Sequence, residues 1–92
     1  MTEQHVKQVK TALVKARGQL ERILKMVESD KYCMDVIQQS NALIGILRGV
    51  NNKILESHLL TCGSRLASRD REDREQFVRE IIRACEVSQR KH

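Results

Sequence analysis

The sequence lacks the residues that interrupt helices and those that form aromatic binding platforms. It contains no proline, no tryptophan, one phenylalanine, one tyrosine and four glycines among its 92 residues. Because Leu, Ile, Val, Lys, Arg, Glu and Gln are plentiful instead, the composition favours long helices over strands. The scarcity of aromatic residues counts against single-stranded nucleic-acid binding, which usually depends on base stacking.

The chain also lacks a long apolar segment and a disulfide-rich composition. No apolar run approaches the length of a membrane span, and the polar start does not resemble a signal peptide. Three cysteines, an odd number, indicate free thiols, metal ligands or redox chemistry before any disulfide scaffold. We therefore expect a cytoplasmic protein that has no membrane partner.

The length and charge indicate one small domain with a polyanionic partner. Residues 1–92 suffice for a single domain with a thin core, which oligomerisation would complete. The formal net charge is +5 and the sequence pI is about 9.5. Double-stranded nucleic acid is the partner that fits this charge best.

Apolar residues recur every three or four positions in three segments, which predicts an all-α chain. We expect a first helix over about residues 6–28, a long central helix over about residues 32–62 and a third over about residues 73–88. The charged stretch 65–74 has no period and is expected to form a loop. Gly45 and Gly49 should be tolerated inside the central helix at about 1 kcal/mol each relative to Ala. Cys85 falls on the apolar face of the third helix and is expected in the core.

Two residues near the end of the central helix have metal-binding chemistry. His58 and Cys62 lie four positions apart, so a helix places both on one face. Imidazole and thiolate together select Cu(I), Zn(II) or Ni(II) over Mg(II) or Ca(II). Taken alone, such a pair is more often a packed thiol beside a solvated imidazole.

Cys33 becomes relevant to this pair when two chains are considered. It lies 25 positions before His58, which on one straight helix corresponds to roughly 37 Å. One ion cannot bridge that distance within a chain. If two central helices pack antiparallel about a two-fold axis, Cys33 of one chain meets His58 and Cys62 of the other, giving two identical sites. The crossing would lie near residues 46–48, where we expect Gly45 and Gly49 to allow close approach.

Three sequence segments resemble a known family of repressors. They are ARGQL at 16–20, YCMDV at 32–36 and LESHLLTC at 55–62, and they are similar to the CsoR/RcnR/FrmR family over about residues 7–88. The set Cys33, His58 and Cys62 resembles the copper-sensing branch. The resemblance implies a homotetramer built as a dimer of dimers, with Cu(I) held between protomers by these three residues. It also implies supporting roles beside the metal for Tyr32 and Glu80.

Other branches of the family leave alternative inducers open. Nickel sensors carry an extra histidine near the N-terminus, and His5 is the candidate here, about one helical turn later than the family's. The same fold could sense formaldehyde or persulfide through Cys33, whose place near a helix start favours a reactive thiolate. Zn(II) and Ni(II) suit the two thiols and one imidazole less well than Cu(I). An enzyme is not expected, because no Asn or Asp stands at a spacing that would orient a Cys–His pair.

Seven basic residues of the first two helices are candidates for contacts with operator DNA. The resemblance implies that the metal-free protein binds its operator and that metal releases it. Ala12 and Gly49 depart from the family, which commonly has basic residues at these positions. A solvated face is the competing interpretation for the basic residues, which are Lys7, Lys10, Lys15, Arg17, Arg22, Arg48 and Lys53.

Overall fold

The protein is described by a computed structural model that covers residues 1–89, with side chains through residue 86. Its elements are α1 (Glu3–Glu28), α2 (Cys33–Cys62), the 3-10 helix η1 (Gly63–Ala67) and α3 (Arg71–Gln89). No strand occurs within the described residues. The predicted all-α fold with a long central helix is confirmed.

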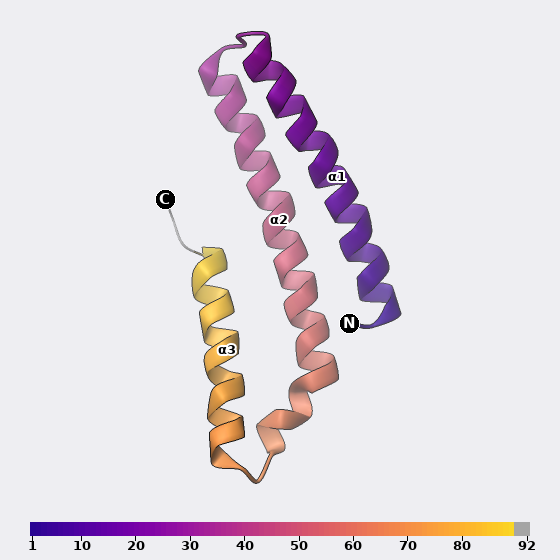
Figure 1. Ribbon diagram of the computed structural model, residues 1–92, viewed down its shortest axis with the longest axis vertical. Helices are drawn as coiled ribbons and strands as arrows, with labels where there is room; N and C mark the ends of the chain where they lie inside the picture. Colours follow the sequence, from indigo (N-terminus) through magenta and orange to yellow (C-terminus); the bar gives the residue numbers. More distant parts are fainter. Residues whose placement is uncertain (90–92) are drawn as a thin grey trace.

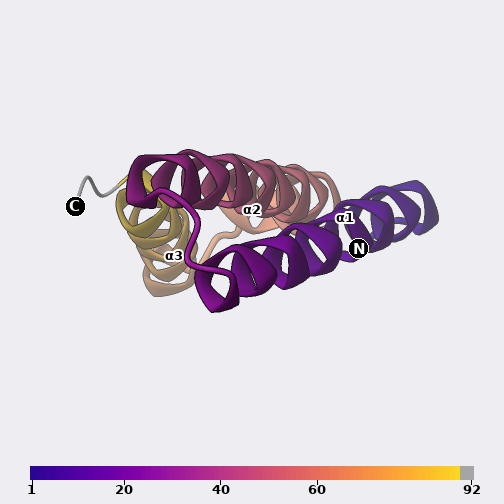
Figure 2. The same ribbon diagram turned by 90° about the horizontal axis from the view of Figure 1, so that it is seen from above.

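The three helices form an open arrangement with α2 in the middle. α1 and α2 make a long antiparallel hairpin, and α3 runs back beside the C-terminal half of α2 on a different side from α1 (Figures 1 and 2). The molecule measures 58 × 30 × 13 Å and has a radius of gyration of 17.3 Å. A compact domain of this length would have a radius of about 12 Å. Among the described residues, no helix is long and apolar enough to cross a membrane.

A side-chain cap explains why α1 begins earlier than predicted. The hydroxyl of Thr2 accepts a hydrogen bond from the His5 backbone N–H at 3.2 Å, and Glu3 in the first turn suits the positive end of the helix. The helix therefore starts at Glu3 and not near residue 6. At the other end, the Ser29 N–H donates to the Lys25 carbonyl, and Asp30 adopts a left-handed φ of 53° that turns the chain toward α2.

The predicted loop over residues 65–74 is too long. η1 continues from the end of α2 through Ala67, and α3 begins at Arg71. The Asp70 carboxylate accepts a hydrogen bond from the Glu72 backbone N–H at 3.0 Å, and the Asp70 carbonyl accepts one from the Arg74 N–H. An acidic cap followed by acidic residues in the first turn starts a helix although that turn carries no apolar residue.

The core is thin and lies along the helix contacts. Among the described hydrophobic side chains, the buried ones are Val9, Ala16, Val50 and Phe77. Cys85, expected in the core, is only half-buried. A core this small leaves much apolar side-chain surface on α1 and α2 exposed to solvent.

Candidate metal centre

The three predicted ligands lie on one side of a single helix. Cys33 is the first residue of α2 and Cys62 is the last, with His58 one turn before the end. An interval of 25 positions is about seven turns of 3.6 residues, so Cys33 and His58 point to nearly the same side of α2. Cys62 falls within about 40° of both. The helix thus carries its candidate ligands in two places, roughly 37 Å apart.

The half formed by His58 and Cys62 is packed. Both side chains are half-buried, and the His58 ring lies 5.3 Å from the ring centroid of Phe77, which is fully buried. The Cys62 sulfur lies 3.6 Å from the hydroxyl of Thr61. α3 supplies Phe77, so the loop and the 3-10 helix that return α3 along α2 also hold this half of the site in place.

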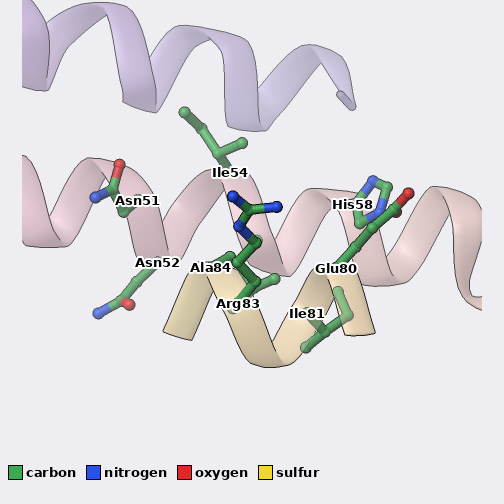
Figure 3. Close-up of a pocket in the computed structure, with 9 residues that line it drawn as sticks. Asn51, Asn52, Ile54, His58, Glu80, Ile81, Arg83 and Ala84 are labelled. Carbon is green, nitrogen blue, oxygen red and sulfur yellow. The ribbon is translucent and has the colours of Figure 1, made fainter. Parts of the chain in front are cut away.

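Glu80 lies beside His58 along a groove between α2 and α3. The groove has a volume of about 560 Å³, and the two side chains approach one another at one end of it (Figure 3). No hydrogen bond joins them in the described structure. The Glu80 carboxylate lies 3.6 Å from the guanidinium of Arg65. Glu80 therefore lies beside His58, the predicted ligand, within one protomer.

The half formed by Cys33 is open. Cys33 is exposed, and Tyr32, at the N-cap of α2, is 67 % exposed. Neither can reach His58 of its own chain, because most of the length of α2 separates them. Tyr32 and Glu80, expected together near the metal, are likewise at opposite ends of the protomer.

The donor chemistry fits a soft metal only when two chains are combined. Among the side chains that the structure describes, no three His, Cys, Asp or Glu residues come close enough to hold an ion. Cys33 and Cys62 carry free thiols. Two thiols and one imidazole suit Cu(I), which accepts low coordination numbers and soft ligands. A complete set requires Cys33 from a second chain.

The expectation that the two central glycines line the crossing point stays a prediction, and helix geometry does not favour it. α2 is continuous, so 12 and 16 positions beyond Cys33 correspond to rotations of about 120° and 160° away from the ligand side. Gly45 and Gly49 therefore face elsewhere, and a Cβ at either would meet nothing within 4 Å. Ile44 and Leu47, both exposed, occupy the ligand side at the middle of α2.

His5 is already engaged within its own chain. Its ring contacts the Thr2 hydroxyl on one side, and its Nε2 lies 3.5 Å from the Glu56 carboxylate on the other. The Thr2 backbone N–H donates to the hydroxyl of Ser57, which is completely buried. These contacts dock the start of α1 onto the turn of α2 next to His58. They do not favour His5 as a fourth metal ligand.

The predicted DNA-contacting residues are all exposed but do not form one face. Five belong to the sides of α1 that point away from α2. Arg48 and Lys53 are separated by about 140° around α2, so they point in different directions. Lys53 is also paired with Glu56 at 3.6 Å. Ala12, where the family has a basic residue, is half-buried.

Sequence reasoning missed three residues around the ligand turn. Arg65 falls within the predicted loop, and neither Phe77 nor Ser57 is among the predicted site residues. Phe77 stands out as the one phenylalanine in an aliphatic chain. Nothing in the sequence distinguishes Arg65 from the other arginines around it, because its role arises from the fold of η1.

Comparisons with known proteins identify the family of this chain. The profile of a family described as metal-sensitive transcriptional repressor matches residues 5–86. The copper-sensing transcriptional repressor CsoR of Mycobacterium ulcerans (strain Agy99) is 47 % identical over 49 residues, 53 % of this chain and 42 % of that protein. The copper-sensing transcriptional repressor RicR of Mycobacterium tuberculosis (strain ATCC 25618 / H37Rv) is 42 % identical over 53 residues, 58 % of this chain and 55 % of that protein.

The alignments leave part of each relative unmatched. The chain spans about half the length of these curated relatives. No solved structure matches it significantly. The family is one of regulators and not of enzymes. Because the family profile covers nearly the whole sequence, this chain belongs to the family of metal-sensitive transcriptional repressors.

Proposed function

We propose that this protein is a copper-responsive repressor whose site is shared between two copies of α2. The observation that carries the proposal is the alignment of Cys33, His58 and Cys62 along one side of an uninterrupted helix. A two-fold axis near residues 46–48 sets Cys33 of one protomer opposite the His58–Cys62 turn of the other. Each pair of protomers then has two identical sites.

The exposed surface supports a dimer of this kind. The chain has a solvent-accessible surface of 7450 Å², whereas a compact protein of 10.6 kDa would expose about 5,500 Å². The excess of about 2,000 Å² per chain, or about 4,000 Å² for two chains, lies in the range of obligate interfaces. Apolar side chains on the ligand side of α2 lie exposed along the helix, namely Ile37, Ile44 and Leu47.

The groove between α2 and α3 suits the partner's α2 in this arrangement. Its walls include Ile54, Leu55 and Ile81, and it ends at His58 and Glu80. In an antiparallel register that pairs Cys33 with the ligand turn, the N-terminal half of the partner's α2 faces this groove. The same register brings Tyr32 of one protomer near Glu80 of the other, where both can hydrogen-bond around the ligand histidine.

The residues that hold the metal also link protomers. A bound Cu(I) would replace two thiol protons, so that the charge of each site would become more negative by one unit, and it would hold the two protomers in one relative orientation. His58 needs a partner for its second nitrogen, and Glu80 is the acceptor placed to provide one. Reduced thiols are required for this chemistry, which agrees with the expected cytoplasmic location.

The DNA contacts belong to the metal-free protein. The five basic residues of α1 have no ion-pair partner within the described structure and remain available for phosphates. We propose that a dimer of dimers assembles them into a broad surface that binds operator DNA. Metal binding shifts the assembly to a shape that fits DNA less well. By linkage, DNA then weakens Cu(I) binding by the same factor, equivalent to about 1–3 kcal/mol.

A second candidate keeps the fold and changes the inducer. The exposed Cys33 thiol at the start of a helix favours direct reaction with formaldehyde or a persulfide. Ni(II) is a weaker alternative, since His5 is engaged by Thr2 and Glu56. His58→Ala separates these cases, because a metal sensor needs the imidazole and a thiol-modification sensor does not.

The test is DNA binding under anaerobic Cu(I) titration. Labelled DNA from upstream of the protein's own gene is followed by fluorescence anisotropy as protein and then Cu(I) are added. The proposal predicts tight metal-free binding that is lost near one Cu(I) per protomer, with no response in His58→Ala. Tight binding indifferent to Cu(I) would contradict the copper assignment, and absence of DNA binding would contradict the repressor assignment for this DNA.

A further inference from the structure

Arg65 lies at the junction of α2 and α3 with contacts to three side chains. Its Nε and Nη2 donate to the Asp73 carboxylate at 3.2 and 2.9 Å. Its guanidinium lies 5.0 Å from the ring centroid of Phe77, and the His58 ring lies 5.3 Å from the same centroid. Its Nη1 lies 3.6 Å from the Glu80 carboxylate. Arg65 is therefore held mainly by Asp73 and Phe77. Loss of its ion pair with Glu80 would leave its position unchanged.

Glu80 has two neighbours that can use its carboxylate. Arg65 attracts it on one side, and His58 lies beside it on the other (Figure 3). The pair with Arg65 is long and partly exposed, with side-chain exposures of 32 % and 48 %. Such pairs are weak, so Glu80 can leave Arg65 with little loss of stability. A histidine fixed by a ligand bond, in contrast, gains from a carboxylate on its second nitrogen.

We propose that Arg65 is a positioning residue that withholds Glu80 from His58 until metal is bound. In the metal-free state Glu80 pairs with Arg65. When the imidazole is fixed, its N–H donates to Glu80, which leaves Arg65, while Arg65 stays on Asp73 and Phe77. When Glu80 leaves Arg65, an ion pair between η1 and α3 is lost. Metal binding at the His58–Cys62 turn of α2 therefore also affects the packing of α3. This inference rests on the proposed metal function and adds a residue that sets its sensitivity.

The proposal predicts that removing Arg65 tightens Cu(I) binding, and only through Glu80. Arg65→Gln should raise the Cu(I) affinity about two- to fivefold, the range expected for release of one exposed ion pair. Glu80→Gln should lower it about 10- to 100-fold, as for other partners of ligand histidines. In the Glu80→Gln background, Arg65→Gln should have no further effect.

The experiment is anaerobic competition with a chromophoric Cu(I) chelator for the full-length protein and these variants. Arg79→Gln is the matched control, because it also replaces one arginine by glutamine. Arg79 lies on α3 and pairs with Glu75, so this change should leave the Cu(I) affinity unchanged. Arg65→Lys restores a cation near Glu80 and should return the affinity to that of the wild type. If circular dichroism shows that Arg65→Gln has lost helix content, Arg65→Met is used in its stead. Methionine keeps an apolar chain against Phe77.

Three outcomes would overturn the exchange. An equal gain in affinity with and without Glu80 would mean that Arg65 acts only by its charge. A weaker or unchanged affinity in Arg65→Gln would mean that Arg65 does not withhold Glu80. If His58→Ala leaves the Cu(I) affinity unchanged, the proposed metal function fails and the exchange fails with it, which distinguishes that result from the first two.

Discussion

The two ends of α2 differ in almost every physical respect although both carry predicted ligands. At the C-terminal end, His58 and Cys62 are half-buried and packed by Phe77. At the N-terminal end, Cys33 is exposed and lies next to an exposed Tyr32. The C-terminal end of α2 thus carries two candidate ligands that are held by packing. The N-terminal end carries one candidate ligand, a thiol that is exposed.

Under the proposed function, this difference explains how a chain with a thin core can hold a metal. Packing limits the motion of the His58 imidazole and the Cys62 thiol, and so reduces the conformational freedom that metal binding must remove. In the proposed dimer the Cys33 thiol needs no pocket of its own, because the partner's groove provides one. Folding of one chain therefore forms one part of the proposed site, and pairing of two chains completes it. Substitutions at the C-terminal end of α2 should change the free energy of unfolding, and those at the N-terminal end should change metal binding alone.

Phe77→Ala should give the largest loss of stability. The ring is fully buried and contacts both His58 and Arg65, so its removal leaves a cavity beside these two residues. We expect a loss of about 3–5 kcal/mol in the free energy of unfolding. Urea unfolding at fixed protein concentration measures it. Tyr32→Ala is the aromatic control at the open end, and an equal loss there would contradict the comparison.

Ser57→Ala should have an intermediate effect. The Ser57 hydroxyl is buried and accepts the hydrogen bond that docks the start of α1. Its removal should lower the free energy of unfolding by about 0.5–1.5 kcal/mol. Amide hydrogen exchange should show faster exchange in the first turn of α1. Unchanged exchange there would show that the Thr2–Ser57 contact does not hold the helix start.

Cys33→Ser should have the smallest effect on folding and a complete effect on metal binding. The side chain is exposed, so the free energy of unfolding should change by less than about 0.5 kcal/mol. Tight Cu(I) binding should be lost, because one of three ligands is missing. Denaturant unfolding and chelator competition on the same preparation measure both quantities. Retained tight binding would remove Cys33 from the site.

The sequence predicted the helices well and their boundaries less well. Apolar spacing located all three, because a 3.6-residue period survives in long amphipathic segments. The early start of α3 was missed because its first turn is held by Asp70 and not by apolar residues. Gly45 and Gly49 lie near the middle of α2 along the chain but are rotated away from the ligand side. Their part in a contact between two chains stays a prediction.

The candidate ligands could be predicted from sequence, and their environment could not. The family resemblance and the spacing along one helix both identify Cys33, His58 and Cys62 without a structure. The stack of Arg65, Phe77 and His58 depends on the angle at which η1 returns α3 to α2, and no local pattern encodes that angle. The same angle places Glu80 between Arg65 and His58.

Mixed dimers of two defective chains test the shared site most directly. Cys33→Ser and Cys62→Ser chains, carrying different affinity tags, are co-expressed, and the heterodimer is purified and titrated with Cu(I) without oxygen. One of its two sites combines both substitutions, and the other combines an intact Cys33 with an intact His58 and Cys62. The account predicts one tightly bound Cu(I) per heterodimer and none in either homodimer. Absence of tight binding in the heterodimer, with assembly intact, would contradict a site built between two chains.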